Sequence, residues 1–300
     1  MSLQKVQTEN ENSKRELNQK TLMLRREKWQ EDHILWQLCR ILKTLIKMVK
    51  AAFLPFFDEL ASFLIPMWGK DKTAQERCAP TVIFASLVRE CPEAALKYCD
   101  IFLPLFLDAS NDENPRVRQN ALYGLGLYAE YGSSVFKPVV KEVISRINVV
   151  IMHLCAREPE NECAYDNAVS ALGKICQFHR ESINSAQIIP VWLNCLPIKG
   201  DLAEAKYVHG ELCSMVERSD IELIGPSYQY IPKIISVFAE VLCSEKDLAT
   251  EETKNRIINI LRQLQQTLPS ATLESALTYL VPRQEMELKS ILSPEEDAGF

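Results

Sequence analysis

Glycine is scarce in this sequence, with 9 residues in 300, well below the average usage of ~7%. Such scarcity is typical of an all-helical chain with short connections. No apolar run approaches the ~20 residues of a membrane span, and the charged N-terminus lacks the apolar core of a signal peptide. The ten cysteines form no Cys-x-x-Cys pair, which indicates a reduced cytosolic or nuclear compartment. We therefore predict a protein without membrane association.

Sequence motifs of catalysis and of ligand chemistry are also missing. The four histidines are far apart and none lies in a His-Glu-x-x-His motif. Cys176 and His179 could share a helix face, but two further ligands at a suitable spacing are absent. The pairs Gly124/Gly126 and Gly173/Lys174 lie inside helical patterns rather than after a strand, so neither is a phosphate-binding loop. We expect no enzymatic activity, no cofactor and no metal.

One stretch, residues 114–132, carries the clearest helical signal. Asn114 is a good N-cap, and Pro115 occupies the first helical position, where proline is well tolerated. Small residues follow at helical spacing, and Gly124 should allow another backbone to approach closely. Gly132 should then end the helix in a left-handed conformation. A helix of this kind cannot bury its apolar face alone, so we expect further helices of the same kind elsewhere in the chain.

Those neighbours recur along the chain. A proline between bulky apolar residues occurs at positions 55, 104, 138, 190 and 232, at intervals scattered about the ~40–47 residues of HEAT-type repeats. A second helix with small central residues follows each proline helix. The sequence thus predicts an all-α fold, an α-solenoid of HEAT-type helical hairpins in a right-handed superhelical stack.

The predicted boundaries follow from this pattern. Residues 1–12 should be disordered, and residues 13–50 should form N-terminal helices of an incomplete repeat, with a break near 26–31. Residues 51–292 should hold about five HEAT pairs and a terminal capping pair, 271–280 with 283–292. Residues 293–300 should be a flexible tail.

Charge is spread unevenly and argues against nucleic acid as a partner. Residues 1–50 hold 11 Lys and Arg against 6 Asp and Glu, whereas residues 51–300 hold 23 against 34. Phosphates require basic surface, which the repeats lack. An acidic solenoid suits a basic polypeptide, although acidic surface can equally serve solubility alone.

Candidate binding residues lie on the second helices, whose exposed positions usually line the concave wall of such a stack. Asn120 and Asn167 are equivalent, and each could bond either an extended ligand or its own repeat. Carboxylates and tyrosines near them could hold the charged ends and aliphatic stems of Lys and Arg. Replacing Glu162, Asp166 and Glu204 together by Ala should weaken binding without unfolding. The full predicted set is Asn120, Glu160, Glu162, Tyr165, Asp166, Asn167, Asp201, Glu204, Tyr207 and Glu211.

Three segments resemble the C-terminal HEAT repeats of a β-karyopherin nuclear import receptor. They are residues 115–132, residues 166–175 and the segment Trp192-Leu-Asn-Cys-Leu-Pro-Ile-Lys-Gly-Asp-Leu202. The last resembles the importin-four and importin-five branch, with the plant-type importin-four most similar, and the resemblance covers residues 51–292.

This resemblance implies a receptor that shuttles between cytoplasm and nucleus. It implies basic cargo, core histones foremost and ribosomal proteins as well, and contacts with nucleoporin Phe-Gly repeats. The family binds the GTPase Ran through N-terminal repeats that this chain lacks. The alternative is a non-transport HEAT scaffold that binds folded protein partners.

Overall fold

The structure is a computed structural model that describes residues 3–269 and 280–292, with the backbone only for residues 3–18 and Ser133. Its described residues are helical and contain no strand, so the all-α prediction is confirmed. The chain forms two compact units, residues 1–91 and 92–300. The predicted helix 271–280 lies, apart from its last residue, outside the described part, as does the predicted tail.

The first unit is built on one long helix, α1 (Leu3–Val49), which packs against α3 (Ala74–Glu90). Helix α1 runs unbroken through residues 26–31, where the sequence suggested a break, and begins within the segment expected to be disordered. Between α1 and α3 lie η1 (Lys50–Phe53), α2 (Leu54–Leu64) and η2 (Ile65–Trp68). Thr73 and Glu76 form a reciprocal capping box that starts α3.

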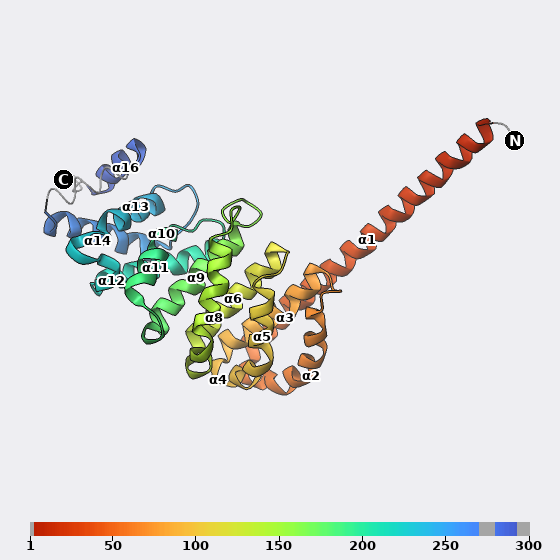
Figure 1. Ribbon diagram of the computed structural model, residues 1–300, viewed down its shortest axis with the longest axis horizontal. Helices are drawn as coiled ribbons and strands as arrows, with labels where there is room; N and C mark the ends of the chain where they lie inside the picture. The colour runs from red at the N-terminus through yellow and green to blue at the C-terminus, as the bar shows by residue number, and fades with distance from the viewer. Residues whose placement is uncertain (1–2, 270–279, 293–300) are drawn as a thin grey trace, which may run out of the picture. The chain divides into compact units, whose positions relative to one another are not determined.

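The second unit is a stack of helical hairpins (Figure 1). Each hairpin has a first helix, often preceded by a short turn of helix, and a longer second helix. The first helices are α5 (Cys99–Ala109), α8 (Val140–Ile151), α10 (Ser185–Cys195) and α13 (Ile231–Leu242), and the second helices are α6 (Pro115–Tyr131), α9 (Glu162–Phe178), α11 (Leu202–Glu217) and α14 (Glu251–Thr267). The short elements are α4 (Pro92–Ala95), η3 (Leu96–Tyr98), α7 (Ser133–Phe136), η4 (Lys137–Val139), η5 (Arg180–Ser182), α12 (Ile221–Ile224) and η6 (Pro226–Tyr228), and α16 (Pro282–Leu292) packs on α13 and α14.

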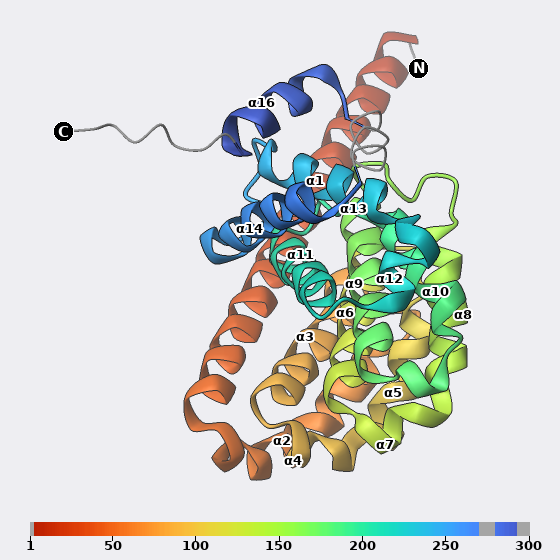
Figure 2. The ribbon, with the colours of Figure 1, turned by 90° about the vertical axis from the view of Figure 1, so that its left-hand side faces the viewer.

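The second helices α6, α9, α11 and α14 lie side by side in chain order, each in contact with the next (Figures 1 and 2). The recurring prolines that revealed this stack occupy different helical positions. Pro104 and Pro190 lie inside helices, whereas Pro55, Pro138 and Pro232 lie in first turns. A first-turn proline loses no intrahelical hydrogen bond, so the shared feature is the apolar neighbourhood of the proline rather than one backbone role.

Helix α6 begins as predicted but ends differently. The Asn114 side chain accepts a hydrogen bond from the Arg116 backbone N–H, with Pro115 in the first turn. The prediction of a left-handed Gly132 is wrong, because its φ is −78° and the chain continues directly into α7. Glycine is needed there for space, since a Cβ would lie 2.4 Å from the Tyr128 carbonyl oxygen.

Gly124 makes room for an aromatic ring rather than for another backbone. A Cβ at Gly124 would lie 2.5 Å from the ring of Phe106, a fully buried residue of α5. A related contact joins two successive hairpins, where a Cβ at Gly173 of α9 would lie 2.8 Å from Nε1 of the buried Trp192 of α10. Small residues on second helices thus receive large side chains from first helices.

Replacing Gly124 by Ala should destabilise the protein, because the added methyl group overlaps a buried ring that cannot move away. We expect a loss of about 1–3 kcal/mol in the free energy of unfolding, measured by urea denaturation. Gly210→Ala is the matched control, because its Cβ would meet only the Thr253 Oγ1 at 3.5 Å. That change should be neutral or stabilise by up to about 1 kcal/mol, since alanine favours helix. Equal destabilisation by both changes would contradict this account of Gly124.

Candidate functional site

The buried carboxylate of Asp166 joins the N-terminal ends of the second helices α9 and α11. Asp166 of α9 is 1% exposed, and its Oδ2 accepts hydrogen bonds from the backbone N–H groups of Gly200 (2.5 Å) and Asp201 (2.8 Å). Burial raises the pKa of Asp166 to about 6, although the two backbone donors favour the charged form. Asp166 therefore holds the turn that precedes α11 against α9.

Asp201 completes the same junction from the other side. It is the N-cap of α11 and accepts from the backbone N–H groups of Ala203 and Glu204. Its other oxygen accepts from the amide groups of Asn167 (2.9 Å) and Gln119 (3.2 Å). Three successive second helices, α6, α9 and α11, thus meet at one carboxylate placed at the favourable end of a helix dipole.

A buried lysine lies further along the row. Lys174 of α9 is 4% exposed, and its Nζ lies 3.3 Å from a carboxylate oxygen of Glu130 and 4.0 Å from one of Glu204. Its ammonium group also lies 4.5 Å from the centre of the Tyr207 ring. The Ser170 hydroxyl donates to the same Glu204 oxygen, Oε2. Glu204 is therefore satisfied by the protein itself.

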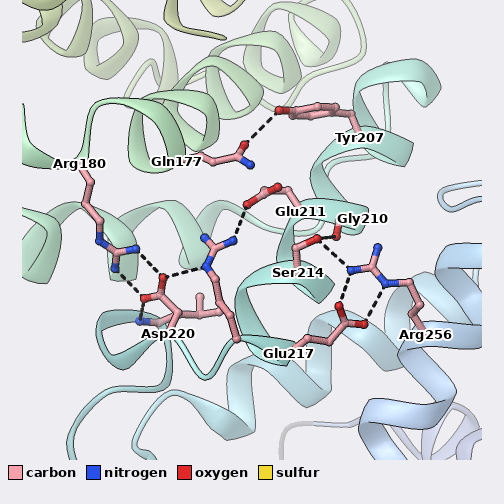
Figure 3. A network of polar contacts seen from close by, with 11 residues as sticks. Gln177, Arg180, Tyr207, Gly210, Glu211, Ser214, Glu217, Asp220 and Arg256 are labelled. Atoms are coloured by element: carbon pink, nitrogen blue, oxygen red, sulfur yellow. Dashed lines mark hydrogen bonds and ion pairs between the residues drawn. The ribbon is translucent and has the colours of Figure 1, made fainter. Parts of the chain in front are cut away.

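The C-terminal ends of the row carry an ionic network (Figure 3). Arg180 donates to both oxygens of Asp220, at 2.5 and 2.7 Å, and to Glu222 at 2.6 Å. Arg218 lies between Asp220 and Glu211, with N–O distances of 3.7 and 3.4 Å. The network links the end of α9 to the end of α11 and to α12.

A second cluster of polar contacts, centred on Arg256, joins α11 to α14. Arg256 donates to both carboxylate oxygens of Glu217, at 2.9 and 2.6 Å, and to the Ser214 hydroxyl (Figure 3). The Tyr207 hydroxyl donates to Gln177 on α9. Every neighbouring pair among the last three second helices is therefore bridged by polar side chains.

The predicted binding residues differ in how far their side chains are buried. Tyr165, Asp166, Asn167, Glu204 and Glu211 are buried, Asn120, Glu162, Asp201 and Tyr207 are half-buried, and Glu160 is exposed. Both asparagines bond their own helices, through the carbonyl oxygens of Arg116 and Cys163. The predicted set is thus partly internal structure, and contact of any of its members with a ligand stays a prediction.

Tyr165 is buried under an arginine that sequence analysis did not single out. The guanidinium of Arg157 stacks on the Tyr165 ring at 4.5 Å and donates to its hydroxyl. Both side chains also donate to the Cys195 carbonyl oxygen. Gln119, Lys174, Arg180 and Arg256 were missed likewise, because their partners lie on other repeats and no local motif marks them.

The described residues contain neither a cluster suited to a metal ion nor a helix suited to a membrane span. Among them, no group of three or more His, Cys, Asp or Glu side chains is placed to hold a metal ion. No helix in the described part of the chain combines the length and hydropathy that a membrane span requires.

Comparisons with known proteins identify the relatives of this stack. Residues 102–132 match the model of the HEAT repeat. The probable importin-5 homolog of Dictyostelium discoideum is 25% identical over 242 residues, which cover 79% of this chain and 22% of that relative. Human importin-4 is 23% identical over 241 residues, 80% of this chain and 21% of the relative. The chain is a homologue of importin-4 and importin-5.

Solved structures of Kap121p share the fold. Kap121p bound to RanGTP aligns with a TM-score of 0.69 at 16% identity, covering 89% of this chain and 24% of that one. Kap121p bound to the SUMO protease Ulp1p aligns with a TM-score of 0.70 at 16% identity, covering 88% and 24%. The chain thus spans about a fifth of the length of the curated importins it matches. The predicted similarity of this chain to plant-type importin-four, within the importin-four and importin-five branch, stays a prediction.

The raised pKa of Asp166 makes the free energy of unfolding of this importin homologue depend on pH. Because the folded-state pKa, about 6, exceeds the ordinary value of 3.8, the folded protein binds the proton more tightly. The resulting stabilisation is complete below pH 4 and is lost as the pH rises through 6. A shift of this size corresponds to about 3 kcal/mol.

Comparing wild type with Asp166→Asn isolates this contribution, because all other groups titrate in both proteins. We expect the wild type to lose about 2–3 kcal/mol relative to the variant between pH 4 and pH 7, as measured by urea denaturation at several pH values. A difference between the two proteins that does not change with pH would show that Asp166 titrates normally.

Removing Arg180 should destabilise the stack, because it leaves the carboxylate of Asp220, with 2% side-chain exposure, without its bidentate partner. We expect Arg180→Ala to cost about 2–4 kcal/mol in the free energy of unfolding. Arg146→Ala is the control, since Arg146 pairs with Glu142 on the surface and such pairs contribute at most about 0.5 kcal/mol. A cost for Arg180→Ala no larger than that of the control would contradict the structural role of the network.

Proposed function

We propose that this chain is the cargo-binding part of a nuclear import receptor, which holds a basic extended segment along the row of second helices α6, α9, α11 and α14. The observation that carries the proposal is the similarity to importins over about four fifths of the chain. Kap121p, which shares the fold, has been solved bound to the extreme C-terminus of Cdc14p and bound to Ste12p. Kap121p therefore binds a terminal segment of another protein, which supports an extended segment as the ligand proposed here.

Charge supports a basic cargo. Residues 51–300 carry 23 Lys and Arg against 34 Asp and Glu. Because Asp166 and Glu204 are satisfied internally, the exposed Glu160 and the half-buried Glu162 at the start of α9 are the carboxylates best placed to meet a ligand. The half-buried Tyr123 and Tyr207 could cover the aliphatic stems of its lysines. We propose core histone tails as the foremost cargo and ribosomal proteins as a second class.

The receptor as a whole would shuttle between cytoplasm and nucleus. Ran would be a further partner of the receptor, as Kap121p has been solved bound to RanGTP, and we propose that it binds through repeats outside this chain. Nucleoporins would be further partners, as Kap121p has been solved with Nup53p. This chain by itself is proposed to bind cargo and to carry out no enzymatic step.

The test is binding of a fluorescent core histone tail peptide to the 300-residue chain at low and at near-physiological salt. Affinity should fall with salt, because exposed charge pairs are screened over ~8–10 Å at physiological ionic strength. The double variant Glu160→Gln/Glu162→Gln should bind about three- to ten-fold more weakly, since each exposed pair contributes about 0.2–1 kcal/mol. This double variant is a better test than the triple replacement of Glu162, Asp166 and Glu204 by Ala. The triple replacement would also remove the hydrogen bonds that Asp166 and Glu204 make within the protein.

The matched control is Glu93→Gln/Glu142→Gln, which removes the same charge from exposed positions of α4 and α8. It should leave the affinity unchanged. Equal loss in both double variants, or equal binding of a scrambled peptide of the same charge, would mean that the acidic surface attracts the peptide without a specific site. Absence of binding at both salt concentrations would favour a scaffold that binds folded partners.

A further inference from the structure

Helix α1 of the first unit has one basic face. Five exposed cations lie on it: Arg25, Arg26, Arg40, Lys43 and Lys47. The helical period of 3.6 residues places all five on the same side of α1. Because α1 is continuous through these positions, the face is about 33 Å long at a rise of 1.5 Å per residue. The N-terminal half of α1 extends beyond the rest of the first unit (Figure 1), which leaves this face open to a ligand.

The positive charge of this face is not neutralised within the described part of the chain. None of the five cations forms an ion pair there. Glu27 and Glu31 lie on the opposite side of α1, and Asp32 lies at the border of the basic face. Partial burial and the like charge of Arg89 on α3 both lower the pKa of Lys43. An anionic ligand would therefore meet cations that no carboxylate of the described residues already holds.

Aromatic rings lie between these cations on the same face. Trp29 is 66% exposed and stacks on His33, with ring centres 5.5 Å apart and an interplanar angle of 15°. Trp36 is 43% exposed, lies 6.4 Å from His33 and is covered at 4.8 Å by the guanidinium of Arg40. These contacts order the rings, and both tryptophans keep accessible surface on which a further flat group can stack.

The combination of rings and cations favours one class of anionic ligand. Single-stranded nucleic acid offers both phosphates and unpaired bases, and proteins bind it with basic surfaces that carry aromatic side chains. An acidic polypeptide would use the charges alone. A helix that lies on a membrane carries its tryptophans on the apolar face. In α1 the tryptophans share the basic face instead, whereas the exposed Ile34, Leu38 and Ile41 lie on another side of the helix.

We propose that the basic face of α1 binds single-stranded nucleic acid. Bases stack on Trp29 and Trp36, and phosphates lie against the five cations. Such contacts tolerate any base sequence, because every base has a flat face. The charge argument against nucleic acid concerned residues 51–300, which are acidic, whereas residues 1–50 are basic. This site belongs to the first unit and does not depend on the cargo proposal.

The probe is a fluorescein-labelled single-stranded DNA of 20 nucleotides and mixed sequence, titrated with the 300-residue chain by fluorescence anisotropy. The logarithm of the affinity should fall with the logarithm of the salt concentration with a slope of about −3, because each neutralised phosphate releases ~0.7 counterion. The duplex of the same sequence should bind at least about five-fold more weakly, since its bases are stacked on one another. An RNA of the same sequence, titrated alongside, distinguishes the two sources of single strands.

Ring variants test the stacking contacts. Trp29→Ala/Trp36→Ala should weaken the single-stranded probe by about ten-fold or more, because stacking on aromatic side chains is a main source of affinity for single strands. The matched control is Phe56→Ala/Phe63→Ala, which removes two exposed rings from α2, 67% and 72% exposed. The control should bind like wild type.

Charge variants test the phosphate contacts. Arg40→Gln/Lys43→Gln/Lys47→Gln should weaken binding about ten-fold at low salt and make the salt slope shallower by about 2. The matched control, Lys70→Gln/Arg116→Gln/Lys141→Gln, removes the same charge from exposed positions outside α1 and should leave affinity and slope unchanged. Thermal unfolding by circular dichroism verifies that every variant keeps the fold.

Loss of affinity in both α1 variants with unchanged binding in their controls supports the site. Equal affinity of wild type and α1 variants, equal loss in the controls, or no binding to wild type overturns it. Equally tight binding of a polyglutamate peptide of 20 residues, or of vesicles of anionic lipid, also overturns it, because neither offers bases. The Glu160→Gln/Glu162→Gln variant should bind the DNA probe like wild type, so failure of this test and failure of the cargo test are distinguishable.

Discussion

The stack of the second unit depends on polar side chains that meet one repeat apart. Asn167 bonds Asp201 and Ser170 bonds Glu204, each 34 positions along the chain, while Arg180 and Asp220 are separated by 40 and Glu217 and Arg256 by 39. Such pairs form only when one second helix lies beside the next in a single register. Desolvation offsets much of the attraction within a buried pair, so their main effect is to exclude other registers, in which the same groups would be buried without partners.

Apolar packing supplies the stability that these polar pairs do not. Large side chains of first helices, such as Phe106 and Trp192, fill positions opposite Gly124 and Gly173 on second helices. The Phe106 contact closes the α5–α6 hairpin, whereas the Trp192 contact joins α9 to α10, the first helix of the next hairpin. These contacts explain why glycine, scarce in the chain as a whole, occurs at the centres of second helices.

Much of this fold was accessible from the sequence because its determinants are local. The N-cap at Asn114 and the apolar residues around each proline lie within one helix or turn, and they predicted the hairpins correctly. Gly132 was misjudged because a glycine required for space cannot be told from a glycine required for a left-handed φ without knowing its neighbours. Arg180 and Lys174 were missed since their partners are brought near only by the stacking of repeats.

The candidate site, like the fold, could be predicted only in part from the sequence. The sequence identified acidic residues near the starts of α9 and α11, but it could not separate those facing solvent from those bonded within the stack. Asp166 and Asp201 look like ligand-binding carboxylates in the sequence, and in the structure they hold the turn before α11 against α9. A carboxylate that is bonded internally no longer attracts a basic ligand at close range, although its charge still adds to the long-range field. Under the proposed function, recognition of a basic ligand falls to carboxylates such as the exposed Glu160, where a ligand gains a contact without displacing one that the fold requires.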